Sequence, residues 1–181
     1  VGELGWELHA PMADLERLYD AVWAAGQPYG IADFGAYAVN CLRMEKAYRG
    51  LGTELTNEIT LVEADCLRFY AADKGEFTGR SETEAVKAKG VTTRLVYAEV
   101  AATDCDIYGG EAVMQGERVV GVCTSGGYGH ATGKSLAFAY VDPGLVDGLE
   151  VVILGERRRF TLLDGPAWDP TNGRQKDGAP S

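Results

Sequence analysis

Residues 118–141 read RVVGVCTSGGYGHATGKSLAFAYV, two apolar runs on either side of a glycine-rich segment. Short β-prone runs bounded by glycine or proline turns are typical of paired strands. Working outward from this stretch, we find six such runs, at residues 92–100, 112–114, 119–124, 136–141, 149–154 and 160–163. Strands packed so closely along the chain predict a small antiparallel barrel or sandwich, not alternating β and α units.

The glycine-rich segment at residues 126–135, GGYGHATGKS, ends like a phosphate-binding loop. That motif needs a glycine five positions before Gly133, where the sequence has Tyr128, and a helix after it, where a strand-like run follows. We therefore expect a loop between strands and no nucleotide site. Ser125 and His130 could form a nucleophile and its base, but the sequence supplies no third member, so an ordinary loop histidine is the favoured interpretation.

The first half of the chain has helical periodicity. Apolar residues at helical spacing predict an amphipathic helix over residues 14–26, and Asp33 can cap a second helix. A third helix is predicted to start at a Ser81 cap and to stop at Gly90. The opening residues 1–8 are typical of part of a hairpin.

Together these patterns predict a chain in two parts with a boundary near Gly90: a part with helices over residues 1–90, and a small antiparallel barrel or sandwich over residues 91–181. The polar tail from Asp169 is expected to be loosely ordered.

Composition excludes several functions. Lys and Arg number 17 against 27 Asp and Glu in 181 residues, a formal charge of −10, so nucleic acid is not an expected partner. No apolar run is long enough to cross a membrane. The 4 cysteines show no C-x-x-C spacing and there are only 2 histidines, so we expect reduced structural thiols and no metal site.

Two pairs of residues are candidates for ligand binding. Glu7 follows Trp6, and a carboxylate beside an aromatic face suits a flat heterocycle with N–H donors, although a surface glutamate is the default interpretation. Arg43 and Glu45 are two apart and do not face each other on a helix. Arg43 could therefore bind a carboxylate or brace the loop after Tyr48.

Five segments in register resemble the glycine cleavage T-protein superfamily. They are VGELGWEL at 1–8, LRMEKAYR at 42–49, LVEAD at 61–65, FTGR at 77–80 and GGYGHATGKSLAFAYV at 126–141. The resemblance is greatest to the C-terminal, folate-binding part of FAD-dependent sarcosine and dimethylglycine dehydrogenases. It implies the C-terminal part of a folate-binding α+β module over residues 1–90, followed by the family's antiparallel barrel.

The resemblance also implies a function. The intact enzyme would oxidise an N-methylated glycine and pass the one-carbon unit to tetrahydrofolate, giving 5,10-methylenetetrahydrofolate. Glu7 matches the glutamate that binds the pterin ring, and Trp6 would shape its pocket. Arg43 and Tyr48 lie in a family motif and are further candidates for folate contact. No catalytic residue is expected in this chain, because the family's acidic residue and the FAD-binding part lie upstream of Val1, so the chain alone should be inactive.

Two alternatives stay open. Aminomethyltransferases carry an Arg-Asp pair where this sequence has Val39 and Asn40, which weakens the alternative of an aminomethyltransferase acting with a lipoyl carrier protein. The missing arginine also leaves open a non-catalytic folate-fold scaffold. Expected partners are the amine substrate, folate and the rest of the same polypeptide, with an oligomer possible. The expected location is the cytoplasm, or the mitochondrial matrix in a eukaryote.

Overall fold

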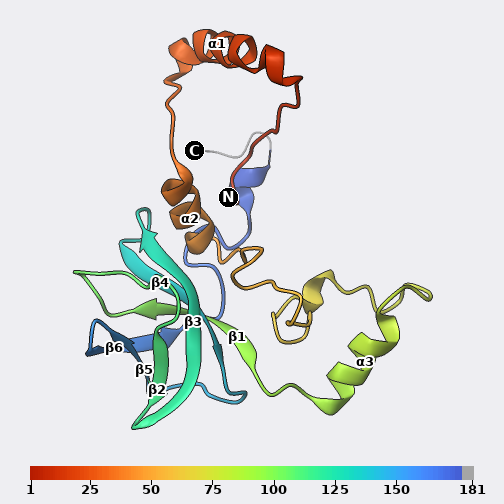
Figure 1. The fold of residues 1–181 in the computed structure, drawn as a ribbon, viewed down its shortest axis with the longest axis vertical. Coiled ribbons are helices and arrows are strands. Elements are labelled where there is room, and N and C mark those ends of the chain that lie inside the picture. Colours follow the sequence, from red (N-terminus) through yellow and green to blue (C-terminus); the bar gives the residue numbers. More distant parts are fainter. Residues whose placement is uncertain (177–181) are drawn as a thin grey trace.

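The computed structural model describes residues 1–176 and contains a barrel from which helical segments extend (Figure 1). Its helices are α1 (Leu15–Gly26), α2 (Ala36–Glu45) and α3 (Arg80–Lys89), and its strands are β1 (Arg94–Val100), β2 (Ala112–Gln115), β3 (Arg118–Gly129), β4 (Lys134–Val141), β5 (Leu149–Ile153) and β6 (Glu156–Leu162). Short 3-10 turns lie at Met12–Asp14, Gln27–Tyr29, Leu67–Phe69 and Gly173–Gln175. The predicted α+β class with an antiparallel barrel is confirmed.

All six strands form one closed barrel in the order β1-β4-β3-β2-β5-β6, and every pair is antiparallel. Closure leaves no unpaired strand edge. Inward-facing residues of all six strands fill the barrel, among them Val96, Val113, Ala139, Val151 and Phe160. No helix contributes a residue to this interior.

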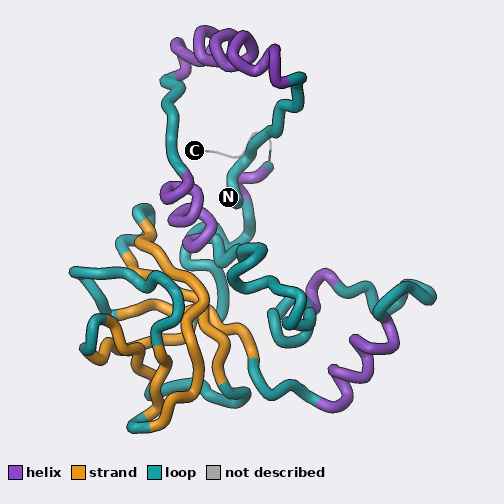
Figure 2. The backbone as a smooth tube through the Cα atoms, viewed as in Figure 1, coloured by secondary structure: helices purple, strands orange, loops and turns teal. Residues whose placement is uncertain are grey.

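A second apolar cluster joins α2 to the outer wall of the barrel. Met44 and Ala47 pack on Leu95, Tyr97, Leu136 and Phe138 from β1 and β4. Figure 2 shows α2 lying directly against the strands, whereas α1 and α3 stand away from them. The end of α2 is therefore the joint between the helical part and the barrel.

The first four residues of the glycine-rich segment, 126–129, belong to strand β3, so the predicted loop between strands is confirmed only for residues 130–133. A Cβ at Gly126 would lie 2.5 Å from Cβ of Ile107, and one at Gly127 would lie 3.1 Å from Nδ2 of Asn40 on α2. The glycines are needed because a helix and a loop approach the strand more closely than side chains allow. Only residues 130–133 separate β3 from β4.

The predicted first helix is confirmed, but its apolar face is not part of a core. No residue of α1 is buried, and in Figure 1 the helix lies at the far end of the molecule from the barrel. Leu15, Tyr19 and Val22 on this face are 46%, 51% and 42% exposed. Asp33 does not cap the next helix, since α2 begins after Gly35 and Asp33 instead accepts a hydrogen bond from the Tyr19 hydroxyl at 2.9 Å.

The structure contradicts some of the remaining local predictions, for residues 1–8 and the start of α3, and confirms the predicted end of α3. Residues 1–8 form no strand, so the predicted hairpin is wrong. Helix α3 follows Gly79 in the left-handed region, and the Ser81 hydroxyl donates to Glu82 instead of capping the helix. Gly90 ends α3 with φ of 82°, as predicted. The boundary near Gly90 stays a prediction.

The described part of the C-terminal tail is not loosely ordered. Its residues Asp169 to Lys176 fold back onto the end of α2 through backbone and side-chain hydrogen bonds. The expectation of a loose tail is wrong there because Asp169 acts as a hydrogen-bond acceptor for three groups. Residues 177–181 lie outside the described part of the chain.

Candidate functional site

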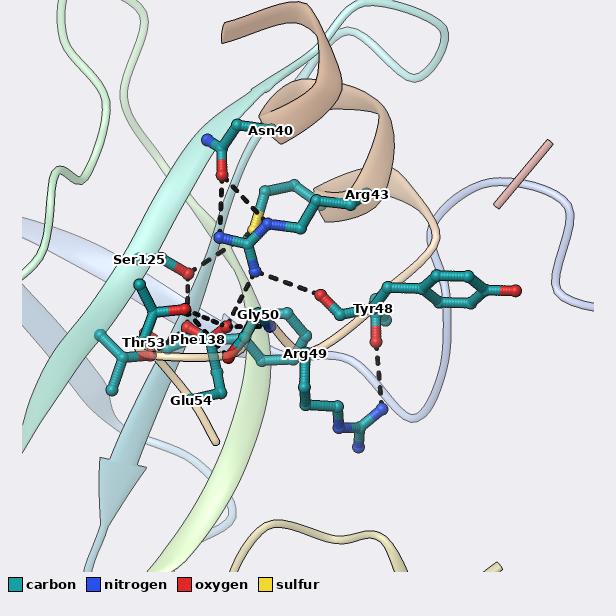
Figure 3. A network of polar contacts seen from close by, with 12 residues as sticks. Asn40, Arg43, Tyr48, Arg49, Gly50, Thr53, Glu54, Ser125 and Phe138 are labelled. Atoms are coloured by element: carbon teal, nitrogen blue, oxygen red, sulfur yellow. Dashed lines mark hydrogen bonds and ion pairs between the residues drawn. The ribbon is translucent and has the colours of Figure 1, made fainter. Parts of the chain in front are cut away.

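A buried carboxylate lies at the joint between α2 and the barrel (Figure 3). Glu54 has no exposed surface. Its carboxylate accepts hydrogen bonds from the hydroxyls of Ser125 at 2.5 Å and Thr124 at 2.6 Å, and from the Gly50 amide at 2.7 Å. Nη1 of Arg43 lies 2.9 Å from Oε2 of Glu54. This acid is held in a fixed position from both the helical part and β3.

The surroundings keep Glu54 ionised. Burial by itself would raise the pKa of the carboxyl, because a charge is less stable away from water. Hydrogen bonds from Ser125, Thr124 and Gly50 and the charge of Arg43 outweigh that effect and lower the pKa. The group is therefore a structural anion with its lone pairs occupied, and it is not poised to exchange a proton near neutral pH.

Arg43 braces the loop after Tyr48, one of the two roles that the sequence left open. Nη1 donates to the Tyr48 carbonyl at 3.1 Å, while Nε and Nη2 donate to Oδ1 of Asn40 at 3.0 and 2.8 Å. The Asn40 amide in turn donates to the Gly126 carbonyl at 2.8 Å. Asn40 thus connects the Arg43 guanidinium to strand β3.

Glu45, the last residue of α2, fixes the turn between β3 and β4. Its Oε1 accepts hydrogen bonds from the amides of Ala131 and Thr132 at 2.9 and 2.8 Å and from the Thr132 hydroxyl at 3.0 Å. His130 in this turn packs edge-on against Tyr128 with ring centroids 5.1 Å apart. Because the Ser125 hydroxyl is committed to Glu54, no Ser-His nucleophile is formed.

Tyr48 lies on the other side of the α2 end, facing the C-terminal tail. Its hydroxyl donates to Oδ1 of Asn172 at 3.1 Å and accepts from Nε2 of Gln175 at 2.6 Å. The ring borders a cavity of about 560 Å³ that Arg68 and Phe69 also line. Tyr48 is accessible from this cavity, but its hydroxyl already has two partners.

Glu7 and Trp6 belong to the open segment that leads to α1. The Glu7 side chain is 90% exposed and Trp6 is 80% exposed. Glu7 and His9, 3.6 Å apart, border an open hollow of about 600 Å³ whose other wall is α1, with Arg17 and Leu18. The hollow has the size of a small-molecule pocket and contains one acid free to accept hydrogen bonds.

The four predicted ligand residues therefore fall into separate places. Arg43 and Tyr48 are joined through a backbone carbonyl, while no hydrogen bond or ion pair links Glu7 or Trp6 to either of them in the described part of the chain. Their roles in folate binding stay predictions. The sequence did not reveal Glu54 as a site residue. Glu54 lies in a polar, glycine-rich loop, and its hydrogen-bond partners Thr124 and Ser125 are about 70 residues away in the chain.

Within residues 1–176, no group of His, Cys, Asp and Glu side chains has a metal-binding arrangement. The four cysteines are free thiols, of which Cys66 and Cys123 are buried. Among the described helices, none has the length and apolar character needed to span a bilayer.

Fold and site together define an α+β protein in which a helical module is joined to a closed antiparallel barrel by buried polar side chains. Models of known protein families match both the helical module and the barrel. Residues 1–74 match the GCVT N-terminal domain, and residues 93–169 match the glycine cleavage T-protein C-terminal barrel domain. The chain belongs to the glycine cleavage T-protein superfamily.

Among curated proteins, mitochondrial dimethylglycine dehydrogenase of Rattus norvegicus is 41% identical over 99% of this chain. Mitochondrial sarcosine dehydrogenase of Mus musculus is 36% identical over 79% of the chain, and the aminomethyltransferase of Shouchella clausii is 32% identical over 94%. The chain spans 22%, 16% and 47% of these three relatives.

One solved structure, glycine cleavage system aminomethyltransferase T from Bartonella henselae, has a TM-score of 0.78 with this chain at 20% identity. The superposition covers 88% of this chain and 45% of that protein. At such low identity the likeness supports the fold alone.

Proposed function

We propose that this chain is the tetrahydrofolate-binding part of an FAD-dependent dehydrogenase that oxidises an N-methylated glycine, dimethylglycine or sarcosine. The enzyme would pass the released one-carbon unit to tetrahydrofolate, in the mitochondrial matrix or a bacterial cytoplasm. The observation that carries the proposal is the match to dimethylglycine dehydrogenase along 99% of the chain at 41% identity.

Asn40 also supports a dehydrogenase over an aminomethyltransferase. The family resemblance implies an acid at this position in aminomethyltransferases, whereas here the amide both donates to the Gly126 carbonyl and accepts from Arg43. A carboxylate could accept from Arg43 but could not donate to the carbonyl. The local structure is therefore built around asparagine, and Val39 provides no guanidinium for folate.

The hollow beside Glu7 is the place that we propose for the pterin ring. Tetrahydrofolate would supply the amine nitrogens that take up the one-carbon unit, and its ring presents N–H donors along one edge. The Glu7 carboxylate can accept two such hydrogen bonds. Trp6 precedes Glu7 in the chain but does not line the hollow, so its ring would have to turn toward the pterin on binding. FAD has no predicted residues within residues 1–176 and would be held by polypeptide outside this chain.

We further propose that polypeptide outside this chain covers the apolar face of α1. A helix of 12 residues is marginal without tertiary packing. The relatives named above contain long regions that this chain does not span, and such a region is the natural partner for the face. Covering α1 would also close the hollow beside Glu7 and exclude water from the reacting groups.

The test uses the full-length protein and two readouts. With dimethylglycine or sarcosine, the flavin absorbance reports amine oxidation, and trapping of free formaldehyde reports one-carbon units that escape. We expect tetrahydrofolate to suppress free formaldehyde in the wild type. Glu7→Ala should restore formaldehyde release and weaken tetrahydrofolate binding in calorimetry, without changing the rate of flavin reduction.

Alternative outcomes separate the rival functions. Folate binding without flavin bands would indicate an aminomethyltransferase, and neither signal would indicate a non-catalytic scaffold. Tight folate binding unchanged by Glu7→Ala would remove Glu7 from the site. Glu58→Ala, at another exposed acid far from the hollow in sequence, is the control and should leave both readouts unchanged.

A further inference from the structure

The C-terminal segment 168–176, which we call the C-terminal strap, contacts both the end of α2 and the start of the chain. On the α2 side, the Trp168 amide donates to the Glu45 carbonyl at 2.9 Å. The Lys46 ammonium forms an ion pair with the Asp169 carboxylate, although the Lys46 side chain is only 1% exposed. A buried ammonium needs such a partner, so Asp169 anchors the strap firmly.

Asp169 also gives the strap its shape. Its carboxylate accepts hydrogen bonds from the amides of Gly173 at 2.8 Å and Arg174 at 3.0 Å. The Asp169 carbonyl accepts from the Asn172 amide at 3.0 Å. Both Asp169 and Asn172 have positive φ, 42° and 53°, so the segment forms a tight turn around one carboxylate. The turn presents Arg174 to the opening residues of the chain.

Arg174 holds those opening residues by two contacts. Its carbonyl accepts from the Leu4 amide at 3.2 Å, and its Nε donates to the Glu3 carboxylate at 2.9 Å. Gly2 lies against the alkyl chain of Lys46, where an added Cβ would come within 2.7 Å of Cγ. Residues 2–4 are thus held between the strap and α2 although they form no strand.

Glu7 comes three residues after the last of these contacts. Three extended residues span about 10 Å, so anchoring Leu4 confines the region that the Glu7 carboxylate can reach. Its own side chain has only the 3.6 Å contact to His9 in the described part of the chain. Since binding depends on donors and acceptors being held in place, the anchor determines how well Glu7 is placed for a ligand.

From these contacts we propose that Asp169 and Arg174 are positioning residues for the folate site: they hold residues 2–4 and thereby place Glu7. The inference rests on the proposed function, because it assumes that Glu7 binds the pterin. Neither residue is required to touch the ligand. The strap provides a route by which residues 168–176 influence a site on the first segment of the chain.

The experiment measures tetrahydrofolate affinity and KM in the full-length protein. Arg174→Glu places like charges opposite Glu3 and should weaken tetrahydrofolate binding about three- to fivefold, the range expected for a partly exposed pair. KM for tetrahydrofolate should rise by the same factor while the rate of flavin reduction stays unchanged. The exchange of charges in Glu3→Arg with Arg174→Glu should recover most of the affinity.

A matched control is available on the barrel. Arg118 and Asp142 form another exposed ion pair, 3.6 Å apart, remote from the strap in the chain. Arg118→Glu should therefore leave tetrahydrofolate binding unchanged. Wild-type affinity in folded Arg174→Glu, or no recovery in the charge exchange, would overturn the positioning role while leaving the proposed function intact. Absence of tetrahydrofolate binding in the wild type would instead overturn the proposed function itself.

Discussion

Arg43 and Glu54 form an ion pair at the joint between helix and barrel, with Nη1 and Oε2 2.9 Å apart and side chains that are 13% and 0% exposed. The guanidinium also lies 5.9 Å from the centre of the Phe138 ring on the barrel wall. The pair therefore lies where apolar and polar contacts meet. It fixes the end of α2, from which Glu45 and Lys46 continue to their own partners on the β3–β4 turn and the strap.

Removing one member of this pair should be costly. Arg43→Met leaves Glu54 buried and unpaired, and we expect a loss of about 3–5 kcal/mol in the free energy of unfolding. Adding Glu54→Gln removes the charge and keeps one acceptor oxygen for Ser125 and Thr124, although the Gly50 amide then loses its acceptor. The double variant should still be more stable than Arg43→Met alone, because an unpaired buried charge costs more than one unpaired amide. Chemical denaturation of the wild type, Arg43→Met, Glu54→Gln and the double variant measures the coupling. A loss below about 1 kcal/mol in Arg43→Met would mean that the pair behaves like an exposed one.

Stability should fall in acid because two carboxyls have lowered pKa values in the fold. Hydrogen bonding to Lys46 is the main cause that lowers the pKa of Asp169 from 3.8 to about 2. The pKa of Glu54 is also lowered from 4.5, the hydrogen bonds and the charge of Arg43 outweighing burial. A lowered pKa in the folded state contributes stability above the unfolded pKa, and this contribution is lost as pH falls through the folded value.

The melting temperature should therefore drop progressively between about pH 4.5 and pH 2. Glu54→Gln and Asp169→Asn together should be less stable at pH 7 but show a flatter acid limb. An acid limb equally steep in this double variant would show that other carboxyls dominate the transition.

The strands of the barrel could be predicted from the sequence, whereas the polar contacts that join α2 to the barrel could not. Each strand is encoded locally by a short β-prone run, so all six were predictable. Their order around the barrel depends on contacts between distant strands, which periodicity does not report. Residues 1–8 have a strand-like pattern but no neighbouring strand to pair with, so they form no strand. Glu54 and Asp169 lie in polar, glycine-rich stretches, where neither period nor motif distinguishes a buried acid from a solvated one.

A loop approaches β3 so closely at Gly126 that we expect no larger side chain to be tolerated at this position. A Cβ there would lie 2.5 Å from the Ile107 Cβ and 2.7 Å from its carbonyl oxygen, so Gly126→Ala forces the backbone apart. We expect destabilisation of about 1–3 kcal/mol, as for overpacked cores. Gly75→Ala is the control, since a Cβ there meets nothing within 4 Å, and its stability should be nearly that of wild type. Equal melting temperatures for the two variants would contradict the packing at β3.

The exposed apolar face of α1 predicts a difference between the full-length protein, in which the face would be covered, and this chain alone, in which it is exposed. Val22 lies on the face and is 42% exposed, whereas Ala24 lies on the opposite side of the helix. If polypeptide outside this chain covers the face, Val22→Glu must bury a charge and should lower the melting temperature of the full-length protein, because an unpaired buried charge is costly. Ala24→Glu should leave it nearly unchanged.

Hydrogen exchange provides the second measurement for the same question. Amides of Leu15–Gly26 should exchange slowly in the full-length wild type and rapidly in residues 1–181 alone, since exchange follows local opening and an unpacked helix frays. Val22→Glu should make the full-length pattern approach that of the isolated chain. If Val22→Glu and Ala24→Glu have the same effect, or if α1 exchanges equally fast in both proteins, the face is not covered by the rest of the polypeptide. The hollow beside Glu7 would then be open to solvent in the intact enzyme, and the exclusion of water would have to come from the folate itself.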